Sequence, residues 1–286
     1  MSIKPKTAEG YADAPVELVR ATCLQIAAVL GSLMDDLVVV GGLVPSLIID
    51  QDNLAEGVEA HVGTLDLDVG MSLAIFDEEH YQAITERLRG ENFEPETKEN
   101  GNLILQTWVN REYGKVTIDF LIPPTGEKGE RAGSIKHLEN DFGAIVAPGL
   151  ECAFVDYEVV TLSGTTLKGE QATRDVKVCG PGAYVVLKAL AFRGRAENKD
   201  AYDLYYLIRN YGGGVEDVAR RFRGLLPSAD CDRALEILRE DFIGSADAIG
   251  IVRATEFLLG EGERNSALQA EIAGFVEAFL RAAEVG

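Results

Sequence analysis

The spacing of hydrophobic residues predicts a helix, a strand and a second helix at the start of the chain. Residues 14–34 have apolar side chains at helical spacing, the pattern of an amphipathic helix. The fully apolar stretch 37–40 is typical of a buried strand, and residues 43–49 predict a helix beginning just after the glycine pair 41–42. An α/β fold is the class that such an order favours.

The middle of the chain predicts further strands around one more helix. Two short apolar segments near residue 160 and before residue 180 read as edge strands that close the first part of the chain. In chain order, we expect a polar excursion at 51–62, a strand around Asp66, a helix at 77–90, a hairpin from 103–109 and 115–122, a loop at 123–131, and edge strands at 155–162 and 176–179.

Beyond residue 180 the pattern changes to helices. Apolar residues recur at helical spacing almost without interruption, and the glycine run 212–214 is typical of a helix stop. The chain therefore predicts two domains, 1–180 and 181–286, with the boundary near Gly180. The expected helices are 183–192, 199–210, 215–226, 230–241, 246–259 and 265–283.

Acidic residues in the first domain form a candidate metal site. Asp66 and Asp68 are two residues apart, so in an extended segment both carboxylates leave the same face. Asp119 lies in a strand-like stretch of branched and aromatic residues, where a buried acid is costly unless a metal or a partner compensates it. The glycines before residue 43 would let backbone N–H groups approach a polyphosphate. Together these features predict a divalent metal beside a triphosphate.

Other interpretations of the acid pair fit less well. A calcium loop starting at Asp66 needs Gly at its sixth position and Glu at its twelfth, where this chain has Met71 and Asp77. A phosphatase nucleophile should end a continuous apolar strand, but polar and glycine residues occur within 61–64. A surface strand with two solvated acids is the simplest alternative, and the upstream glycines and Asp119 favour the metal site over it.

Composition sets the class of protein. With 286 residues and 47% hydrophobic content, the chain can bury a large core. Its four cysteines form no Cys-x-x-Cys pair, which argues against a zinc site or a disulfide framework. We expect 37–49 to be the longest apolar region, and it is too short and glycine-broken to span a membrane, so we expect a cytoplasmic protein with no membrane partner. The dispersed histidines suggest no metal cluster; we expect each at the surface or in a loop, with only His61 near the acid pair.

The net charge of −20 opposes general binding to nucleic acid, because affinity for phosphate backbones needs basic surface. One local basic stretch, 188–199, has four cations and a single acid. Lys188, Arg195 and Lys199 would share a face if one helix continued through Gly194. A solvated basic face near a helix end is the alternative explanation.

These motifs together resemble the AbiEii/AbiGii toxin family, which belongs to the polymerase-β-type nucleotidyltransferase superfamily. The resemblance covers about residues 35–210 and implies a nucleotidyltransferase-type mixed sheet flanked by helices, followed by a helical domain. It depends on Gly41-Gly42, the segment His61-Val-Gly-Thr-Leu-Asp-Leu-Asp68, Asp119, Lys188, Arg195 and the segment Lys199-Asp-Ala-Tyr-Asp-Leu204.

The resemblance also implies roles for individual residues. The acid pair and Asp119 match the catalytic metal ligands, and Lys188 matches the essential lysine of the family. Gly41 and Gly42 match its phosphate-contacting turn. Leu43 follows the glycines in place of an adjacent serine, which leaves Ser46 as the candidate for a hydroxyl contact. Asp200 and the catalytic Asp203 match the Lys-Asp-x-x-Asp segment, and the remaining nucleotide-binding candidates are Thr64, Arg195 and Lys199.

The implied activity moves a nucleoside monophosphate from an NTP to an acceptor. Two Mg²⁺ ions, or Mn²⁺ in their place, would be held by the three acids and would bridge the triphosphate. Asp119 could accept the proton of the acceptor hydroxyl, and Lys188 would contact the β or γ phosphate as a point charge.

The resemblance further implies a toxin that modifies the 3′ end of tRNA and a DNA-binding antitoxin encoded nearby. Modification of a small-molecule hydroxyl, as in antibiotic resistance, or of a protein side chain is an alternative that the acidic composition favours. A regulator that binds NTP without turnover is another. For Lys199 and Asp203, an i,i+4 ion pair worth about 0.3–0.5 kcal/mol is the structural alternative.

Overall fold

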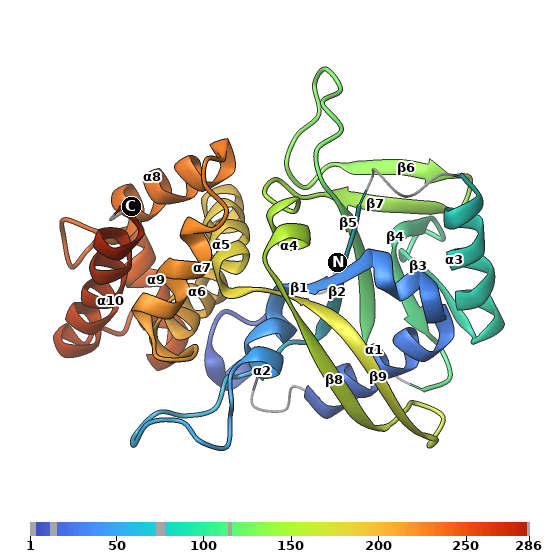
Figure 1. Ribbon diagram of the computed structural model, residues 1–286, viewed down its shortest axis with the longest axis horizontal. Helices are drawn as coiled ribbons and strands as arrows, with labels where there is room; N and C mark the ends of the chain where they lie inside the picture. Colours follow the sequence, from blue (N-terminus) through green and yellow to red (C-terminus); the bar gives the residue numbers. More distant parts are fainter. Residues whose placement is uncertain (1–3, 12–15, 73–77, 114–115, 285–286) are drawn as a thin grey trace. The chain divides into compact units, whose positions relative to one another are not determined.

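The computed structural model describes residues 4–11, 16–72, 78–113 and 116–284 (Figure 1). The chain divides into two compact units, one made of the described residues of 15–44 and 64–179, the other of those of 2–14, 45–63 and 180–286. The main boundary falls between Cys179 and Gly180. The segments 2–14 and 45–63, which the sequence analysis assigned to the first domain, belong to the helical unit.

The first unit is built on a mixed sheet, and the α/β class with flanking helices and C-terminal helices is confirmed. The described residues contribute nine strands in the order β3-β4-β5-β2-β1-β9-β8, with β7 pairing β5 and β6. Neighbours are parallel at β2/β5, β1/β9 and β5/β7 and antiparallel elsewhere. The strands are β1 (Leu37–Val40), β2 (Asp66–Met71), β3 (Phe93–Thr97), β4 (Leu103–Asn110), β5 (Thr117–Ile122), β6 (Ile135–Glu139), β7 (Phe142–Val146), β8 (Tyr157–Thr165) and β9 (Gln171–Cys179).

The opening helix packs against this sheet. In α1 (Val16–Leu30), Val19, Cys23, Ile26 and Leu30 recur at helical spacing and are fully buried. The helix contacts β2, β8 and β9 as well as α3 (Glu78–Gly90). A 3₁₀ segment, Gly31–Asp36, then leads into β1, whose four residues are all buried because the sheet is covered there.

One helical stretch among the described residues, Val16–Asp36, is long and apolar enough by length and composition to cross a membrane. Of its apolar window, 44% is buried. A core helix of a folded domain has the same composition, and the packing of α1 on the sheet agrees with that role. The helix predicted at 14–34 covers most of this stretch, and the expectation that 37–49 is the longest apolar region is wrong.

Some strands differ from the prediction. β3, β6 and β7 were missed, and residues 77, 114 and 115 of the predicted helix and hairpin lie outside the described residues. The prediction that 176–179 forms an edge strand is wrong, because β9 lies between β8 and β1, with Val39 opposite Val178. Only the last residues of β9 face the core, so its polar first half gave no sign of a central strand.

The second unit contains the predicted C-terminal helices. In its described residues these are α5 (Pro181–Arg195), α6 (Asn198–Asn210), α7 (Val215–Arg223), α8 (Ala229–Phe242), α9 (Ile249–Leu259) and α10 (Ser266–Glu284). Helix α5 continues through Gly194 and ends at Arg195, since Ala196 adopts a left-handed conformation with φ of 50°. Lys199 therefore lies on α6, so the single continuous helix on which Lys188, Arg195 and Lys199 would have shared a face does not form.

The two earlier segments of this unit pack on its helices. The 3₁₀ turn η1 (Ala8–Tyr11) contacts α9, with the rings of Tyr11 and Phe257 5.7 Å apart. Segment 45–63 packs on Tyr206, whose hydroxyl lies 3.1 Å from Oε1 of Gln51 and 3.2 Å from the carbonyl oxygen of Glu59. The excursion expected at 51–62 is thus an ordered loop on α6.

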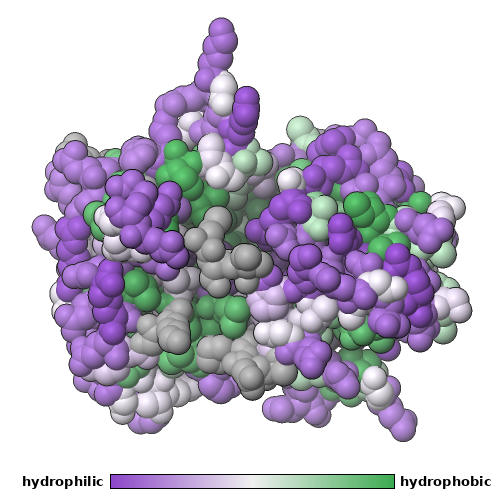
Figure 2. Space-filling view, turned by 180° about the vertical axis from the view of Figure 1, so that it is seen from behind, coloured by the Kyte–Doolittle hydropathy of each residue, from purple (hydrophilic) through white to green (hydrophobic). Residues whose placement is uncertain are grey.

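Figure 2 shows that hydrophilic residues predominate on one face of the molecule, in keeping with its high net charge.

Candidate metal centre

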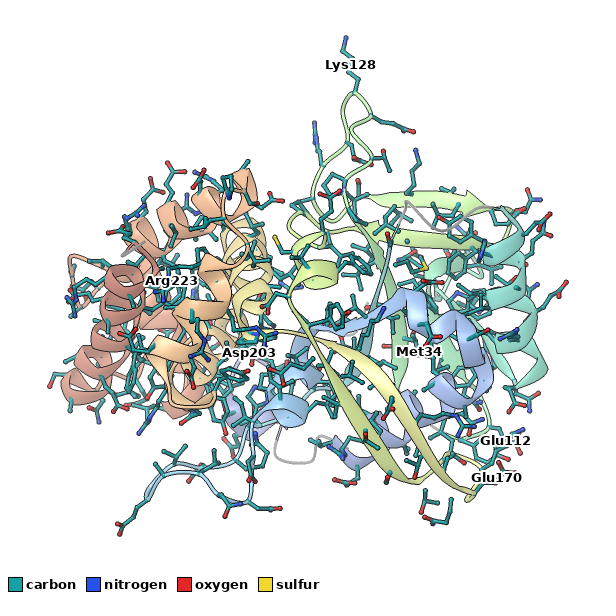
Figure 3. All side chains as sticks on the ribbon, in the orientation of Figure 1. Met34, Glu112, Lys128, Glu170, Asp203 and Arg223 are labelled. Atoms are coloured by element: carbon teal, nitrogen blue, oxygen red, sulfur yellow. The ribbon has the colours of Figure 1, made fainter. Side chains whose placement is uncertain are left out.

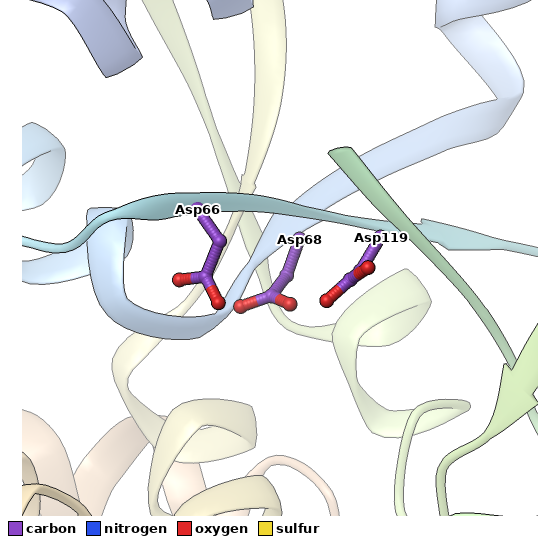
Figure 4. Close-up of side chains that lie close together, drawn as sticks. All are labelled: Asp66, Asp68 and Asp119. Atoms are coloured by element: carbon purple, nitrogen blue, oxygen red, sulfur yellow. The ribbon is translucent and has the colours of Figure 1, made fainter. Parts of the chain in front are cut away.

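The three predicted metal ligands converge on neighbouring strands. Asp66 and Asp68 leave the same face of β2, and Asp68 is in parallel register with Asp119 on β5. Each carboxylate offers one oxygen, and these oxygens all lie within 4.8 Å of one another. Figure 4 shows the carboxylates on one side of the two strands, with Asp68 in the middle.

The donor set fits a divalent metal ion. Asp66 is buried at 6% exposure, and Asp68 and Asp119 are half-buried. Three like charges at this spacing repel one another, and a cation between them offsets that repulsion. Carboxylate oxygens are the ligands that Mg²⁺ and Mn²⁺ prefer. The cluster can therefore hold such an ion.

Threonine hydroxyls contact two of these carboxylates. The Oγ1 of Thr64, just before β2, donates a 2.6 Å hydrogen bond to Oδ1 of Asp66. The Oγ1 of Thr107, on β4, donates a 2.6 Å hydrogen bond to Oδ1 of Asp119. Thr64 was expected to contact nucleotide, and in the structure its hydroxyl is directed at a metal-ligand candidate instead.

Gly41 lies against the third carboxylate. Its φ of +71° favours glycine, and a Cβ at this position would lie 1.8 Å from Oδ2 of Asp68. A side chain would therefore displace the carboxylate, which gives Gly41 a role that needs no phosphate. Gly42 is buried beside it, and Ser46 is half-buried on α2 (Val44–Ile48), in the part of that helix assigned to the second unit.

The predicted basic residues form an ionic network in the second unit around the buried Asp200 and Asp203, with Arg195 at its exposed edge. The Lys188 ammonium donates to Asp203 at 2.7 Å and to Asp200 at 3.0 Å. Lys199 donates to both oxygens of Asp203, so the i,i+4 ion pair is present. Arg195 makes a bidentate contact with Asp200 at 2.7 and 2.8 Å. Asp203, labelled in Figure 3, is fully buried and is the centre of the network.

His61 is a member of this network that the sequence analysis did not assign to it. Its Nε2 lies 2.9 Å from Oδ1 of Asp203, and its Nδ1 accepts a hydrogen bond from the N–H of Gly63. With Nδ1 as acceptor, the neutral ring carries its proton on Nε2 and donates it to Asp203. The ring packs between Tyr202 and Tyr206. His61 is in a loop, as expected, but it is buried rather than exposed.

The network fixes the charges of its members. Burial and the nearby Lys199 lower the pKa of His61 to about 4, so the ring is neutral at pH 7. Burial opposes the ionisation of Asp203, but Lys188 and Lys199 outweigh it and hold its pKa well below the usual range. Burial likewise opposes the charge on Lys188, and Asp203 and Asp200 overcome it and raise its pKa.

The same balance between burial and neighbouring charges sets the pKa values of Asp200 and Lys199. Burial opposes the charge on Asp200, yet Lys188 and Arg195 lower its pKa to about 2. Burial lowers the pKa of Lys199, an effect that Asp203 partly offsets. The acids of the network are thus ionised at neutral pH, with lysine and arginine side chains as their partners.

The site candidates therefore fall into two groups. Gly41, Gly42, Thr64 and the three acids belong to the sheet unit, whereas the network residues and Ser46 belong to the helical unit. Thr107 and His61 are the two contributors that sequence reasoning missed. Thr107 could have been found from the predicted hairpin, because pairing its strands places a hydroxyl opposite Asp119. For His61 the signals were its place five residues before Asp66 and its inclusion in the segment on which the resemblance depends.

A scan against models of known protein families gave no match for this chain, and a search of curated proteins found no relative. The resemblance described above therefore stays a prediction.

Proposed function

We propose that this chain is a metal-dependent nucleotidyltransferase that moves a nucleoside monophosphate from an NTP to an acceptor hydroxyl. The observation that carries the proposal is the convergence of Asp66, Asp68 and Asp119, from two adjacent parallel strands, with ligand oxygens within 4.8 Å of one another. In the resemblance, the same three acids hold two Mg²⁺ ions within a nucleotidyltransferase-type sheet. When bound, these ions offset the charge on the triphosphate and on the attacking and leaving oxygens.

The residues of the chain then have definite tasks. Asp66, Asp68 and Asp119 hold the cations, and Asp119 accepts the proton of the acceptor hydroxyl. The acceptor oxygen forms a bond to the α phosphorus while the bond from that phosphorus to the bridging oxygen breaks, and pyrophosphate leaves. The resemblance assigns to Lys188 the contact with the β or γ phosphate, and Asp200 and Asp203 keep its ammonium charged and oriented.

The acceptor that the resemblance suggests is the 3′ end of tRNA, in a toxin controlled by a DNA-binding antitoxin. A net charge of −20 favours the second candidate, a small-molecule hydroxyl or a protein side chain, because it disfavours broad contact with a nucleic-acid backbone. The two candidates share the metal centre and differ only in the acceptor.

The test is transfer of label from each α-labelled NTP in the presence of Mg²⁺. Total RNA, the protein alone and a panel of hydroxyl-bearing small molecules serve as separate acceptors, so the labelled product identifies the class. Asp66→Asn should abolish labelling, whereas Asp175→Asn, at an exposed acid of β9, should leave it unchanged. Transfer by Asp66→Asn at the wild-type rate would show that the acids are not the site. NTP binding without any labelled product would instead favour the regulator.

A further inference from the structure

Resting on the proposed function, the geometry points to Thr64 and Thr107 as positioning residues of the metal centre. Each hydroxyl donates to one oxygen of an outer carboxylate and so holds Asp66 and Asp119 in the orientation in which they face a cation. Neither threonine was needed to propose transfer, and their role can be tested on metal binding alone.

The contact at Asp119 is set by strand pairing. Thr107 on β4 is directly opposite Asp119 in the antiparallel register, and its side chain is buried at 9% exposure. A 2.6 Å hydrogen bond to Oδ1 restricts rotation of the carboxylate group. A carboxylate held in this way keeps a fixed orientation toward the metal.

The contact at Asp66 is local. Thr64 is two residues before Asp66 and is buried at 4% exposure, and its hydroxyl bonds Oδ1 at the same 2.6 Å. Asp68, between the other two, is confined by the backbone of Gly41 instead. Each of the three carboxylates is thus oriented by a different neighbour.

A hydroxyl suits this task better than a cationic donor. It donates one hydrogen bond and brings no charge, so it orients a carboxylate and leaves the negative charge that attracts a divalent ion. In the ionic network the reverse holds, because lysine and arginine donors both orient and neutralise Asp200 and Asp203.

The sheet also contains a matched control for this contact. On β8 and β9, Thr161 is opposite Asp175 in antiparallel register, and its hydroxyl donates a 2.6 Å hydrogen bond to Oδ1 of that acid. This pair has the same chemistry and length as Thr107 with Asp119, but both of its residues are exposed. Removing the hydroxyl at either place deletes the same hydrogen bond.

The experiment is a Mn²⁺ titration of the full chain near neutral pH, with free Mn²⁺ measured by electron paramagnetic resonance. Thr107→Val keeps the side-chain shape and should weaken Mn²⁺ binding at least about 10-fold, as loss of an outer contact to a metal ligand does. Thr107→Ser restores the hydroxyl and should bind within about twofold of wild type, as should Thr161→Val. Thr64→Val and Thr64→Ser apply the same test to the hydrogen bond between Thr64 and Asp66.

The outcomes separate the two proposals. Unchanged Mn²⁺ binding by Thr107→Val, or an equal loss in Thr107→Ser, would overturn the positioning role. If Asp119→Asn loses Mn²⁺ binding while Thr107→Val does not, only that role fails and the metal centre stands. If Asp119→Asn binds Mn²⁺ like wild type, the proposed function fails with it.

In transfer assays, Thr107→Val should raise the Mg²⁺ concentration needed for half-maximal rate more than it raises the KM for NTP. If Thr107 were needed only for folding, Thr107→Val would lower both the transfer rate and the folded fraction, and Thr107→Ser would not restore them.

Discussion

The metal centre and the ionic network both place aspartates close together, but they give them different partners. In the sheet unit, two of the three acids accept hydrogen bonds from threonine hydroxyls. In the helical unit, Asp200 and Asp203 accept them from lysine, arginine and histidine N–H groups. The threonine donors in the sheet unit are neutral, whereas the lysine and arginine donors in the helical unit are cationic.

This difference shows how one residue type serves two purposes. Acids that are oriented by neutral groups keep the charge that binds a divalent cation. Acids surrounded by ammonium and guanidinium groups are neutralised and also stabilise the fold, because breaking a buried pair leaves a charge uncompensated. The substitutions below distinguish the two regions, beginning with the largest effect.

The strongest test removes a ligand from the metal centre. Asp119→Asn keeps the side-chain volume and removes both the charge and the proton acceptor, so the rate of nucleotide transfer should fall at least about 1,000-fold, or roughly 4 kcal/mol. The rate of label transfer from NTP measures it. In Lys199→Arg, which keeps a cation in the network, the rate of label transfer should fall by a much smaller factor. An equal loss of rate in the two variants would contradict the difference between the metal centre and the network.

The same Asp→Asn change should have different effects on folding in the two regions. Asp203→Asn leaves Lys188 and Lys199 without their shared acid and should lower the free energy of unfolding by about 3–5 kcal/mol. Asp68→Asn reduces repulsion among three like charges and should leave that free energy unchanged or higher, while removing the stabilisation by Mn²⁺. Urea unfolding with and without Mn²⁺ measures both. Equal destabilisation by the two variants would contradict the comparison.

Acid should weaken the network through His61. Its pKa is about 4 in the folded protein against 6.5 ordinarily, so the unfolded chain takes up a proton first as the pH falls. The stability from the neutral ring is complete above pH 6.5 and is lost as the pH falls toward 4. The difference of about 2.5 units corresponds to roughly 3 kcal/mol at about 1.4 kcal/mol per unit.

Urea unfolding of wild type and His61→Gln across this pH window measures that loss. The amide nitrogen of glutamine can replace the Nε2 donor but does not titrate, so the variant should lose less stability between pH 6.5 and 4. Parallel profiles for the two proteins would mean that His61 is not the titrating group.

The smallest effect on folding is expected at the glycine beside the metal centre. Gly41→Ala places a side chain at a φ of +71°, which should cost about 1–2 kcal/mol of stability. The new Cβ would also force Asp68 to move, so Mn²⁺ binding should fall further than stability does. Gly57→Ala, at a φ of +80° with open space around the added Cβ, is the control and should lose stability without loss of Mn²⁺ binding.

Periodicity alone was enough to predict much of the fold. The C-terminal helices were found because their apolar residues repeat at helical spacing, and β1 because its four residues are all apolar. The strands β6 and β7 were missed because each is only five residues long and β6 has no fully buried side chain. The centrality of β9 depends on its pairing with β1, a contact between residues about 140 positions apart that no local pattern records.

The candidate site was predictable where the spacing was local. Asp66 and Asp68 follow directly from the two-residue repeat of a strand, whereas bringing Asp119 beside them requires β2 and β5 to be neighbours. The helix-face argument for the basic residues failed at Ala196, although Lys188 and Lys199 still meet at Asp203. The burial of His61 depends on Tyr202 and Tyr206 packing around it, which its own segment does not predict.

The helical unit is assembled from three separate stretches of the chain, and this limits how it can be expressed on its own. A fragment that starts at Gly180 would lack both Tyr11 and His61. It would therefore uncover the aromatic rings of Phe257, Tyr202 and Tyr206 and take away a hydrogen bond from Asp203. Such a truncation should aggregate, and a soluble version would need residues 4–11 and 45–63 joined back by designed linkers.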